Sequence, residues 1–402
     1  MKVKNWEVGS HWFGDLDGKE YQNSDLSYIY KFPETAIEPI KTSGMEFLST
    51  CRSAIGKSID KYANLYEDID SYENKDVALV PAFTCQSVLE PFIQRHIKCI
   101  PYPINIDLSI DVKALFDLIK EYRYRLYKIL IHAYFGFDTV VELRRMLKEE
   151  DIFWNLWIWI IEDRTQSMFS KLPELESISK VGSIRKWFPI PDGSYVAYGS
   201  DPDDQTSCNY FFSSYQEDTG LIDAKKFAFG LKNNYIMKGE GSKNIYMQFY
   251  SAAEQILNSQ TTCYAMSTAS KNYLSHVDYD AMKIQRINNY QLLSNRLRKH
   301  EPYIHTLFPD VDNGIVPFML PVLIREKRKE FQDFMAEHNV FPTIIWSCPD
   351  TFRPFIYGSG KTGINYSDTK AIYDSILCFH IDQRYNERDM EKVADIIDQF
   401  SF

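Results

Sequence analysis

Apolar and polar residues alternate in blocks that predict a repeated strand–helix order in the first half of the chain. Apolar runs with the length of buried strands occur at residues 77–81, 99–102, 128–136 and 153–161. Between them apolar residues recur at helical spacing, most clearly over residues 110–122. Strands that alternate with helices are typical of a parallel sheet covered by helices. We therefore expect an α/β fold whose ligands bind at the carboxyl ends of the strands.

The second half predicts long helices followed by a smaller α/β module. A strand at 194–198 and a polar loop at 200–220 precede helical patterns over residues 221–300. A new module begins near residue 302. Its expected elements are strands at 316–324, 340–346 and 375–382 and helices at 325–338 and 387–399. We divide the chain into an N-terminal arm (1–45), a large domain (46–275) and a small C-terminal domain (276–402).

Charge and cysteine content exclude several classes of function. The chain has 402 residues and a net charge of −10 without any run of Lys and Arg, which argues against nucleic-acid binding. Its seven cysteines are an odd number without a Cys-x-x-Cys pair, which argues against a disulfide framework and a zinc site. The longest apolar run, 152–161, is too short to span a bilayer. We expect a cytoplasmic protein with reduced thiols that does not associate with membranes.

The segment around Lys186 contains the residues that indicate a specific chemistry. Lys186 follows Ser183 in a Ser-x-x-Lys pattern, and a predicted upstream strand ends in Asp163, with Gln166 three residues later. This is the linear layout of a site for pyridoxal 5′-phosphate (PLP), which needs an amine for its Schiff base, an acid near its ring nitrogen and donors for its phosphate. A solvated lysine and an aspartate that caps a helix explain the same residues taken singly.

Five motifs in order resemble the DegT/DnrJ/EryC1/StrS family of PLP-dependent sugar aminotransferases, from about residue 47 to the C-terminus. They are Val-Pro-x-x-Thr (80–84), His-x-x-x-Gly (132–136), Glu-Asp-x-x-Gln (162–166), Ser-x-x-Lys (183–186) and the Gly at 193. The resemblance implies fold type I: a large domain with a mainly parallel seven-stranded sheet and a smaller C-terminal α/β domain.

The resemblance also implies a role for each matching residue. Lys186 would hold PLP and move a proton during catalysis. Asp163 would pair with the ring nitrogen, Gln166 would donate to the phenolic oxygen, and Thr84 and Cys85 would lie beside the ring.

The cofactor phosphate would be held by Ser183 and by the backbone N–H groups of Arg52 and Ser53. Two departures from the family pattern concern the cofactor site, one near the phosphate and one beside the ring. Cys51 and Arg52 stand where the family usually has Gly-Thr, and Cys85 stands where it usually has an aromatic residue or His. A side chain at a usual Gly position narrows the backbone freedom, although Arg52 could add a positive charge for the phosphate.

The function implied is transfer of an amino group from an amino acid, Glu or Gln, to a keto-sugar nucleotide in amino-sugar or surface-polysaccharide biosynthesis. The family further implies a homodimer. Three alternatives stay open. Other PLP chemistry on sugars is one, although family members that deoxygenate sugars replace the lysine by His. A non-catalytic scaffold is the second, suggested by Cys51, Arg52 and Cys85 and opposed by the intact Asp163, Gln166 and Lys186. A different α/β enzyme, for example a nucleotide-binding one, is the third, and no Gly-x-Gly-x-x-Gly or Gly-x4-Gly-Lys-Ser/Thr motif supports it.

Overall fold

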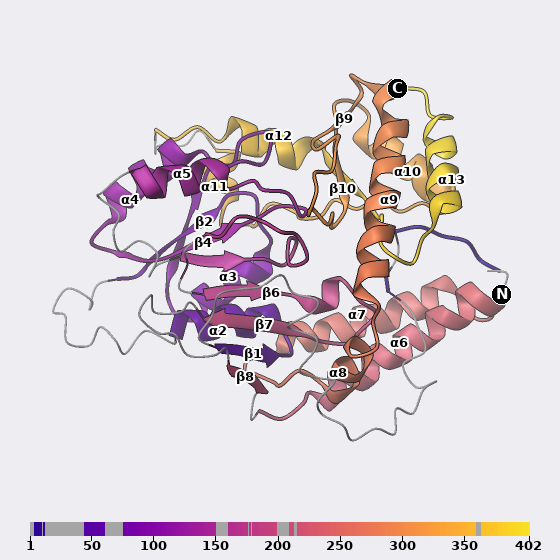
Figure 1. Ribbon diagram of the computed structural model, residues 1–402, viewed down its shortest axis with the longest axis horizontal. Coiled ribbons are helices and arrows are strands. Elements are labelled where there is room, and N and C mark those ends of the chain that lie inside the picture. The colour runs from indigo at the N-terminus through magenta and orange to yellow at the C-terminus, as the bar shows by residue number, and fades with distance from the viewer. Residues whose placement is uncertain are drawn as a thin grey trace.

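The protein builds two sheets, a larger one at the left and centre of Figure 1 and a smaller one at its upper right. The computed structural model describes residues 4–9, 11–12, 44–60, 75–149, 160–175, 177, 179–198, 209–212, 215–358 and 363–402. Within them, the larger sheet has eight strands and the smaller has three. None of the described helices combines the length and apolar character that crossing a bilayer requires.

The larger sheet is parallel except for one strand. Its strands are β1 (Gly44–Leu48), β2 (Val77–Pro81), β3 (Lys98–Tyr102), β4 (Leu126–His132), β5 (Ile160–Asp163), β6 (Ser179–Gly182), β7 (Ser194–Tyr198) and β8 (Asn209–Phe212). They lie in the order β3-β2-β4-β5-β6-β7-β1-β8. Only β7 runs antiparallel to its neighbours, β6 and β1. The carboxyl ends of β1, β2, β4, β5 and β6 therefore meet at one edge.

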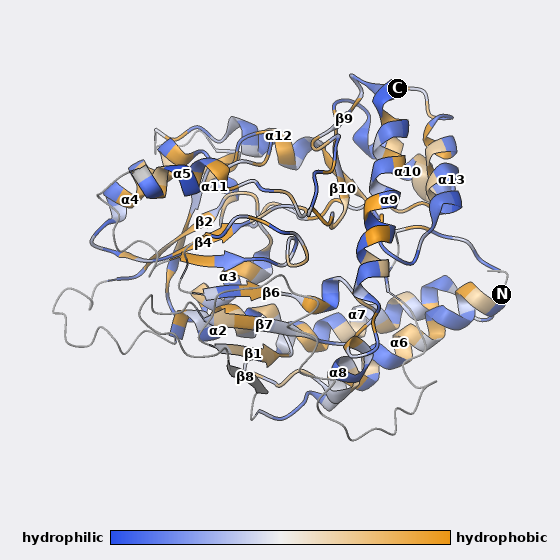
Figure 2. Cartoon of the chain, in the orientation of Figure 1, coloured by the Kyte–Doolittle hydropathy of each residue, from blue (hydrophilic) through white to orange (hydrophobic). Residues whose placement is uncertain are grey.

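Helices pack on this sheet through apolar faces, which alternate with polar faces along each helix (Figure 2). They are α2 (Cys51–Asp60), α3 (Gln86–Ile93), α4 (Val112–Tyr122) and α5 (Val141–Glu149). In α4 the buried residues recur at helical spacing, including Val112, Leu115, Phe116 and Ile119. Asp111 begins this helix, because its side chain accepts a hydrogen bond from the backbone N–H of Ala114 at 3.0 Å.

A helical hairpin follows the larger sheet and lies at its lower right in Figure 1. It consists of α6 (Thr219–Lys238) and α7 (Lys243–Ser259). Gly239 ends α6 in the left-handed conformation at φ 73°, which glycine adopts without steric cost. The two helices enclose a small core of their own, formed by Ala228, Phe229, Tyr246 and Tyr250.

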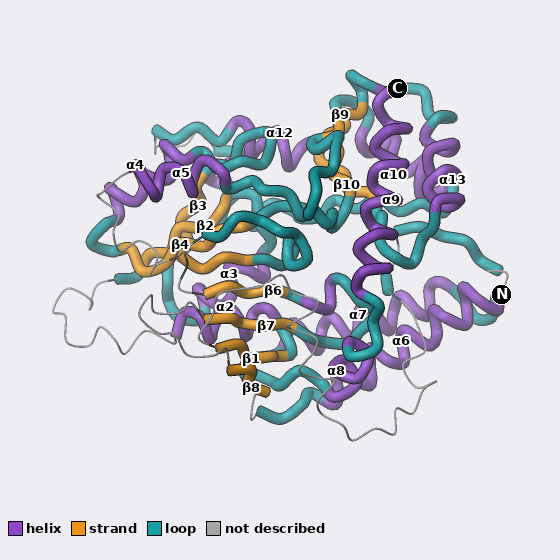
Figure 3. The backbone as a smooth tube through the Cα atoms, in the orientation of Figure 1, coloured by secondary structure: helices purple, strands orange, loops and turns teal. Residues whose placement is uncertain are grey.

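The remaining chain forms α8 (Thr268–Leu274), α9 (Tyr279–Leu297) and the smaller sheet. This sheet is antiparallel in the order β11-β10-β9, with β9 (Ile304–Thr306), β10 (Leu320–Ile324) and β11 (Ile376–Phe379). Its helices are α10 (Arg328–Glu337), α11 (Arg353–Ile356), α12 (Ser367–Ser375) and α13 (Glu387–Ile397). Figure 3 shows the long loops that connect these elements with the larger sheet.

The α/β class and the mainly parallel sheet are confirmed, and two elements differ from expectation. The sheet gains an eighth strand, β8, inside the segment 200–220 that was predicted as a loop. The strand predicted at 340–346 is wrong. Its residues form only isolated bridges, Val340 with Val8 and Thr343 with Cys378. Pro342 lacks the N–H that a continuous ladder requires, so the segment divides its pairing between two partners.

The main hydrophobic core is continuous from the larger sheet to the smaller one. The division at residues 45 and 275 therefore stays a prediction. Of the expected arm, the described residues 4–9 and 11–12 pack on α6 and on the C-terminal half. The backbone N–H of Lys4 donates to the carbonyl of Ile236 at 3.0 Å, and that of Phe341 donates to the carbonyl of Val8 at 2.7 Å. Most of the apolar run 153–161 lies outside the described residues.

Candidate active site

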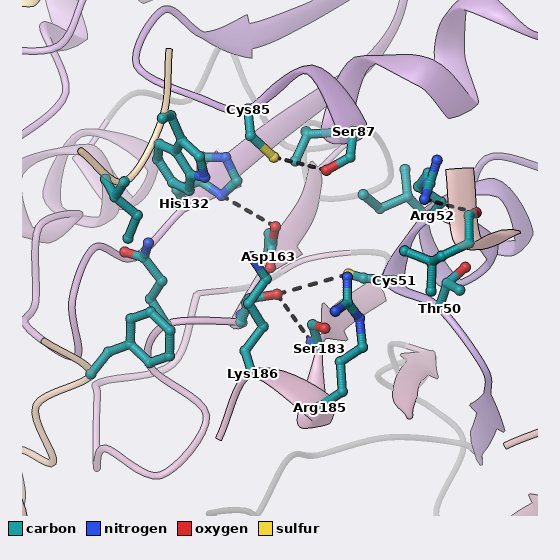
Figure 4. Close-up of a pocket in the computed structure, with 18 of the residues that line it drawn as sticks. Thr50, Cys51, Arg52, Cys85, Ser87, His132, Asp163, Ser183, Arg185 and Lys186 are labelled. Carbon is teal, nitrogen blue, oxygen red and sulfur yellow. Dashed lines mark hydrogen bonds and ion pairs between the residues drawn. The ribbon is translucent and has the colours of Figure 1, made fainter. Parts of the chain in front are cut away.

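A cavity of about 250 Å³ lies at the edge where the parallel strands end. Six of the eight predicted cofactor-site residues line it: Arg52, Cys85, Asp163, Gln166, Ser183 and Lys186. Figure 4 shows the labelled residues of this wall, which come from the start of α2, the start of α3 and the ends of β4, β5 and β6. Thr84 and Ser53 do not line the cavity.

A chain of polar contacts orients the carboxylate of Asp163. Its Oδ1 accepts from the backbone N–H of Thr165 at 2.8 Å, and its Oδ2 lies 3.4 Å from Nδ1 of His132. Nε2 of His132 lies 2.8 Å from Oγ1 of Thr84. Burial lowers the pKa of His132, against the opposing charge of Asp163, so its imidazole is neutral near pH 7. Thr84 thus contacts His132 without lining the cavity itself, and its expected place beside the cofactor ring stays a prediction.

Among the described residues, the side-chain amide of Gln166 makes a hydrogen bond through its oxygen alone. Its Oε1 accepts from the backbone N–H of Phe135 at 2.8 Å. This bond fixes the side chain and leaves Nε2 as the donor on the side of the cavity. An N–H donor is what a phenolic oxygen requires.

The segment that carries Lys186 is a single 3₁₀ turn, Ile184–Lys186, which follows β6. Two hydrogen bonds tie it to Thr165: the backbone N–H of Ser183 donates to Oγ1 at 3.0 Å, and the indole N–H of Trp187 donates to the carbonyl at 2.7 Å. Lys186 itself is exposed, whereas its neighbours Ser183 and Trp187 are buried. The turn therefore presents the amine to the open part of the site.

The start of α2 forms the opposite wall. Thr50 caps this helix, because its Oγ1 accepts from the backbone N–H of Ser53 at 3.2 Å. The N–H of Ser53 is therefore occupied, and the N–H groups of Cys51 and Arg52, which precede the first intrahelical bond, are the donors left at this end. Burial and the charge of Asp163 raise the pKa of the Cys51 thiol, which is thus a neutral neighbour of Thr165.

The guanidinium of Arg52 binds protein acceptors, although its charge suggested a role as a phosphate ligand. It donates to Oε2 of Glu90 at 2.7 Å, to the carbonyl of Leu257 at 3.0 Å and to Oδ1 of Asn258 at 3.0 Å. These bonds join α2 to α3 and to the end of α7. The side chain of Arg52 therefore serves the packing of three helices.

Several residues at the cavity were missed by the sequence interpretation, among them Thr165, Arg185 and Trp346. Thr165 orients both strand ends, and its place between Asp163 and Gln166 was the available signal. Trp346 stacks on His132 with ring centroids 5.6 Å apart. It lies far along the chain in the segment predicted as a strand, and no local pattern places it here.

A second cavity, of about 550 Å³, adjoins the first. The residues that line both cavities are Arg185, Lys186, Glu254, Phe318 and Ile345. Its outer wall is formed by residues from the N-terminal segment, the hairpin and the C-terminal half, including Trp12, Lys243 and Arg384. Arg384 is held by Asp382 in a two-point ion pair, with Nε–Oδ1 2.7 Å and Nη2–Oδ2 2.8 Å.

Solved structures, but not known sequences, resemble this protein. No family model matches the sequence, and none of the curated proteins does. Solved structures do match. An aminotransferase of the DegT/DnrJ/EryC1/StrS type from Brucella abortus has a TM-score of 0.58 at 13% identity, over 92% of this chain and 93% of that one. The S. venezuelae protein DesV has a TM-score of 0.60 at 14% identity, over 98% of this chain and 90% of that one.

A third structure is PseC of Helicobacter pylori, described as an aminotransferase in pseudoaminic acid biosynthesis. It has a TM-score of 0.59 at 11% identity and covers 98% of each chain. The chain has the fold of these aminotransferases. The expectation of fold type I is thus confirmed by structure. Because the sequence identities are only 11–14%, the similarity concerns the fold alone. In this chain, the cavity at the strand ends brings Asp163, Gln166 and Lys186 together.

Proposed function

We propose that this protein is a PLP-dependent aminotransferase that moves an amino group from an amino acid, Glu or Gln, to a keto-sugar nucleotide. The position of Lys186 carries the proposal. Its side chain lies where two cavities meet, one lined by Asp163, Gln166 and Ser183 and the other open toward the C-terminal half. An amine that serves first a cofactor and then a substrate needs access to both spaces.

The residues of the inner cavity fit PLP by their donor and acceptor chemistry. Asp163 offers a fixed carboxylate for the ring nitrogen, and Gln166 offers Nε2 for the phenolic oxygen. The hydroxyl of Ser183 and the backbone N–H groups of Cys51 and Arg52 face the same space without another described partner. When bound, PLP supplies an electron-withdrawing ring that stabilises negative charge on the substrate carbon.

The chain's own groups would divide the work as follows. Nζ of Lys186 holds the cofactor and then carries the proton to and from the substrate carbon. Asp163 keeps the ring nitrogen protonated through its negative charge, and His132 keeps Asp163 in orientation. The indole of Trp346 closes the side of the cavity next to His132.

The keto-sugar nucleotide is the substrate class that the outer cavity suits. At about 550 Å³ it lies within the roughly 300–1,000 Å³ typical of small-molecule sites. Lys243 and Arg384 bring positive charge to its wall, which favours an anionic diphosphate. Among the structural neighbours, DesI was solved with its TDP-sugar product, at a TM-score of 0.60 and 12% identity.

The proposal is tested by adding PLP to the purified protein and to Lys186→Ala. We expect a visible absorbance band in the wild type that the variant lacks, and we expect glutamate to change that band. Lys113→Ala, an exposed lysine on α4, is the matched control. Amino transfer from ¹⁵N-labelled glutamate to a keto-sugar nucleotide, followed by mass spectrometry, should fall about 10²- to 10⁴-fold or more in Lys186→Ala.

A wild-type protein that shows no band at any PLP concentration would contradict catalysis and favour a binding scaffold. A band that no amino donor alters would favour other PLP chemistry.

The assembly that accompanies this activity is proposed to be a homodimer. Apolar side chains are exposed on the hairpin, with Phe227 52% and Ile245 47% exposed. The ring centroids of Phe227 and Phe249 lie 4.7 Å apart. Apolar side chains that gather on one surface favour contact with another chain. Light scattering on the purified protein checks the mass, and a monomer at micromolar concentration would contradict the dimer.

A further inference from the structure

Arg185 directly precedes Lys186 and has an uncommitted guanidinium. Its side chain is 22% exposed and makes one ion pair, from Nη1 to Oε1 of Glu254 at 3.5 Å. That distance is beyond a normal hydrogen bond. The same Oε1 accepts a hydrogen bond from Nζ of Lys225. The five N–H donors of Arg185 therefore have no described hydrogen-bond acceptor of their own.

Positive charge is in excess around Glu254. Burial by itself raises the pKa of this carboxyl, but Arg185 and Lys225 outweigh it and lower the pKa to about 2. Glu254 is therefore ionised near pH 7 and still faces two cations. A single carboxylate shared by two cations leaves room for an anion beside Arg185.

The position of Glu254 places Arg185 near the start of α2. Glu254 and Asn258 lie one turn apart on α7, and both line the inner cavity. Arg52, the second residue of α2, donates to Asn258 at 3.0 Å. Arg185 and the start of α2 thus face the same side of α7. Figure 4 shows the side chain of Arg185 directed toward Cys51 and passing beside Ser183.

Three kinds of hydrogen-bond donor that can bind an anion lie beside the start of α2. The N-terminus of α2 offers the backbone N–H groups of Cys51 and Arg52 and the positive end of the helix dipole. Ser183 offers its hydroxyl, and Arg185 offers a planar fork of N–H groups that suits phosphate oxygens in pairs. The guanidinium of Arg52, by contrast, already donates hydrogen bonds to three protein acceptors.

We infer that Arg185 binds the phosphate of the cofactor, as the charged member of a site completed by Ser183 and the start of α2. The inference rests on the proposed function, because it assigns the phosphate to PLP. It also explains how the chain tolerates Cys51-Arg52 at the start of α2. A charged donor from the lysine segment adds to the backbone donors of that turn.

The test compares PLP with pyridoxal, which has the same ring and no phosphate. Equilibrium binding of both compounds is measured by absorbance in the wild type, Arg185→Gln, Arg185→Lys and the exposed control Arg388→Gln. We expect Arg185→Gln to weaken PLP binding about 10- to 100-fold, because hydrogen bonds to charged groups are worth about 1.5–3 kcal/mol. Pyridoxal affinity should be unchanged, Arg185→Lys should recover part of the loss, and Arg388→Gln should match the wild type.

A second measurement needs no cofactor. Inorganic phosphate should raise the thermal midpoint of the wild type and raise it much less in Arg185→Gln. This comparison also shows whether the variant folds, because its midpoint without phosphate is recorded in the same experiment.

The outcomes separate this inference from the proposed function. Equal PLP affinity in the wild type and Arg185→Gln, with weaker binding of glutamate in the variant, would assign Arg185 to the substrate carboxylate and overturn the inference alone. Equal losses for PLP and pyridoxal would overturn it as well, because they would show a general disturbance of the cavity. A wild type without PLP affinity would overturn both proposals.

Discussion

At the scale of the residue, Asp192 shows how a buried carboxyl fixes the loop behind Lys186. Its oxygens accept from the backbone N–H of Ser267 at 2.9 Å and from the hydroxyls of Ser267 and Ser270, each at 2.6 Å. These bonds tie the loop before β7 to the start of α8. Burial raises the pKa of Asp192 to about 6, although the three hydrogen bonds favour the charged form.

This shift predicts a pH dependence of stability. Between pH 3.8, the ordinary value, and about pH 6 the folded protein binds more protons at Asp192 than the unfolded chain does. The free energy of unfolding therefore decreases as the pH rises through this window, by about 3 kcal/mol at most from this group. Asp192→Asn should lose this decrease. Urea unfolding of both proteins from pH 4 to pH 7 measures it, and parallel pH profiles would contradict the shifted pKa.

At the scale of the element, α2 depends on Arg52 for its contacts with other helices. The guanidinium joins α2 to Glu90 on α3 and to the last residues of α7. Since Thr50 satisfies the N–H of Ser53, the helix starts correctly without Arg52. The guanidinium therefore contributes to the packing of α2 against α3 and α7.

Arg52→Ala should lower the free energy of unfolding by about 2 kcal/mol, because it removes hydrogen bonds that a charged donor makes to partly buried acceptors. Its effect on the ratio of PLP to pyridoxal affinity should be small, unlike that of Arg185→Gln. Chemical denaturation and the binding assay measure the two effects, with Arg325→Ala, an exposed arginine, as the control. A selective loss of PLP affinity would return the phosphate role to the side chain of Arg52.

At the scale of the whole molecule, the N-terminal segment joins the hairpin to the C-terminal half. Val8 bridges Val340, and Glu7 is buried between Lys232 at 3.1 Å and Lys243 at 3.2 Å. Burial and the charge of Arg384 lower the pKa of Lys232 to about 7, against the opposing charge of Glu7. The segment therefore holds one wall of the outer cavity through a buried ion pair.

Glu7→Gln should destabilise the protein by about 3 kcal/mol, because it leaves Lys232 buried without its counter-charge. Adding Lys232→Met should recover part of this loss, since the buried ammonium is then removed as well. Thermal or urea unfolding measures both, and Glu240→Gln, an exposed carboxylate next to the hairpin turn, is the control. If the single and double variants were equally unstable, packing rather than charge would hold the segment.

The sequence by itself determined the order of most elements and the central part of the site. Apolar periodicity located β2, β4, β7, α4 and α9, because burial on one face or both imposes that period on any chain. The linear layout of a PLP site also linked Asp163 with Lys186, and both residues line one cavity. The strand before Lys186, β6, was not predicted, and its parallel pairing with β5 brings the two segments to one edge.

Only the tertiary structure decided which groups beyond these segments reach the cavity. Trp346, Glu254 and Asn258 come to the site by packing of segments that lie far apart in the sequence, which no local pattern records. The two arginines show the same limit. Arg52 was expected near the phosphate from its position, but helix packing gives its guanidinium three protein acceptors, whereas among the described residues Arg185 makes only a 3.5 Å ion pair with Glu254. Local sequence determines which elements form, whereas the distances between side chains of different elements depend on how the whole core packs.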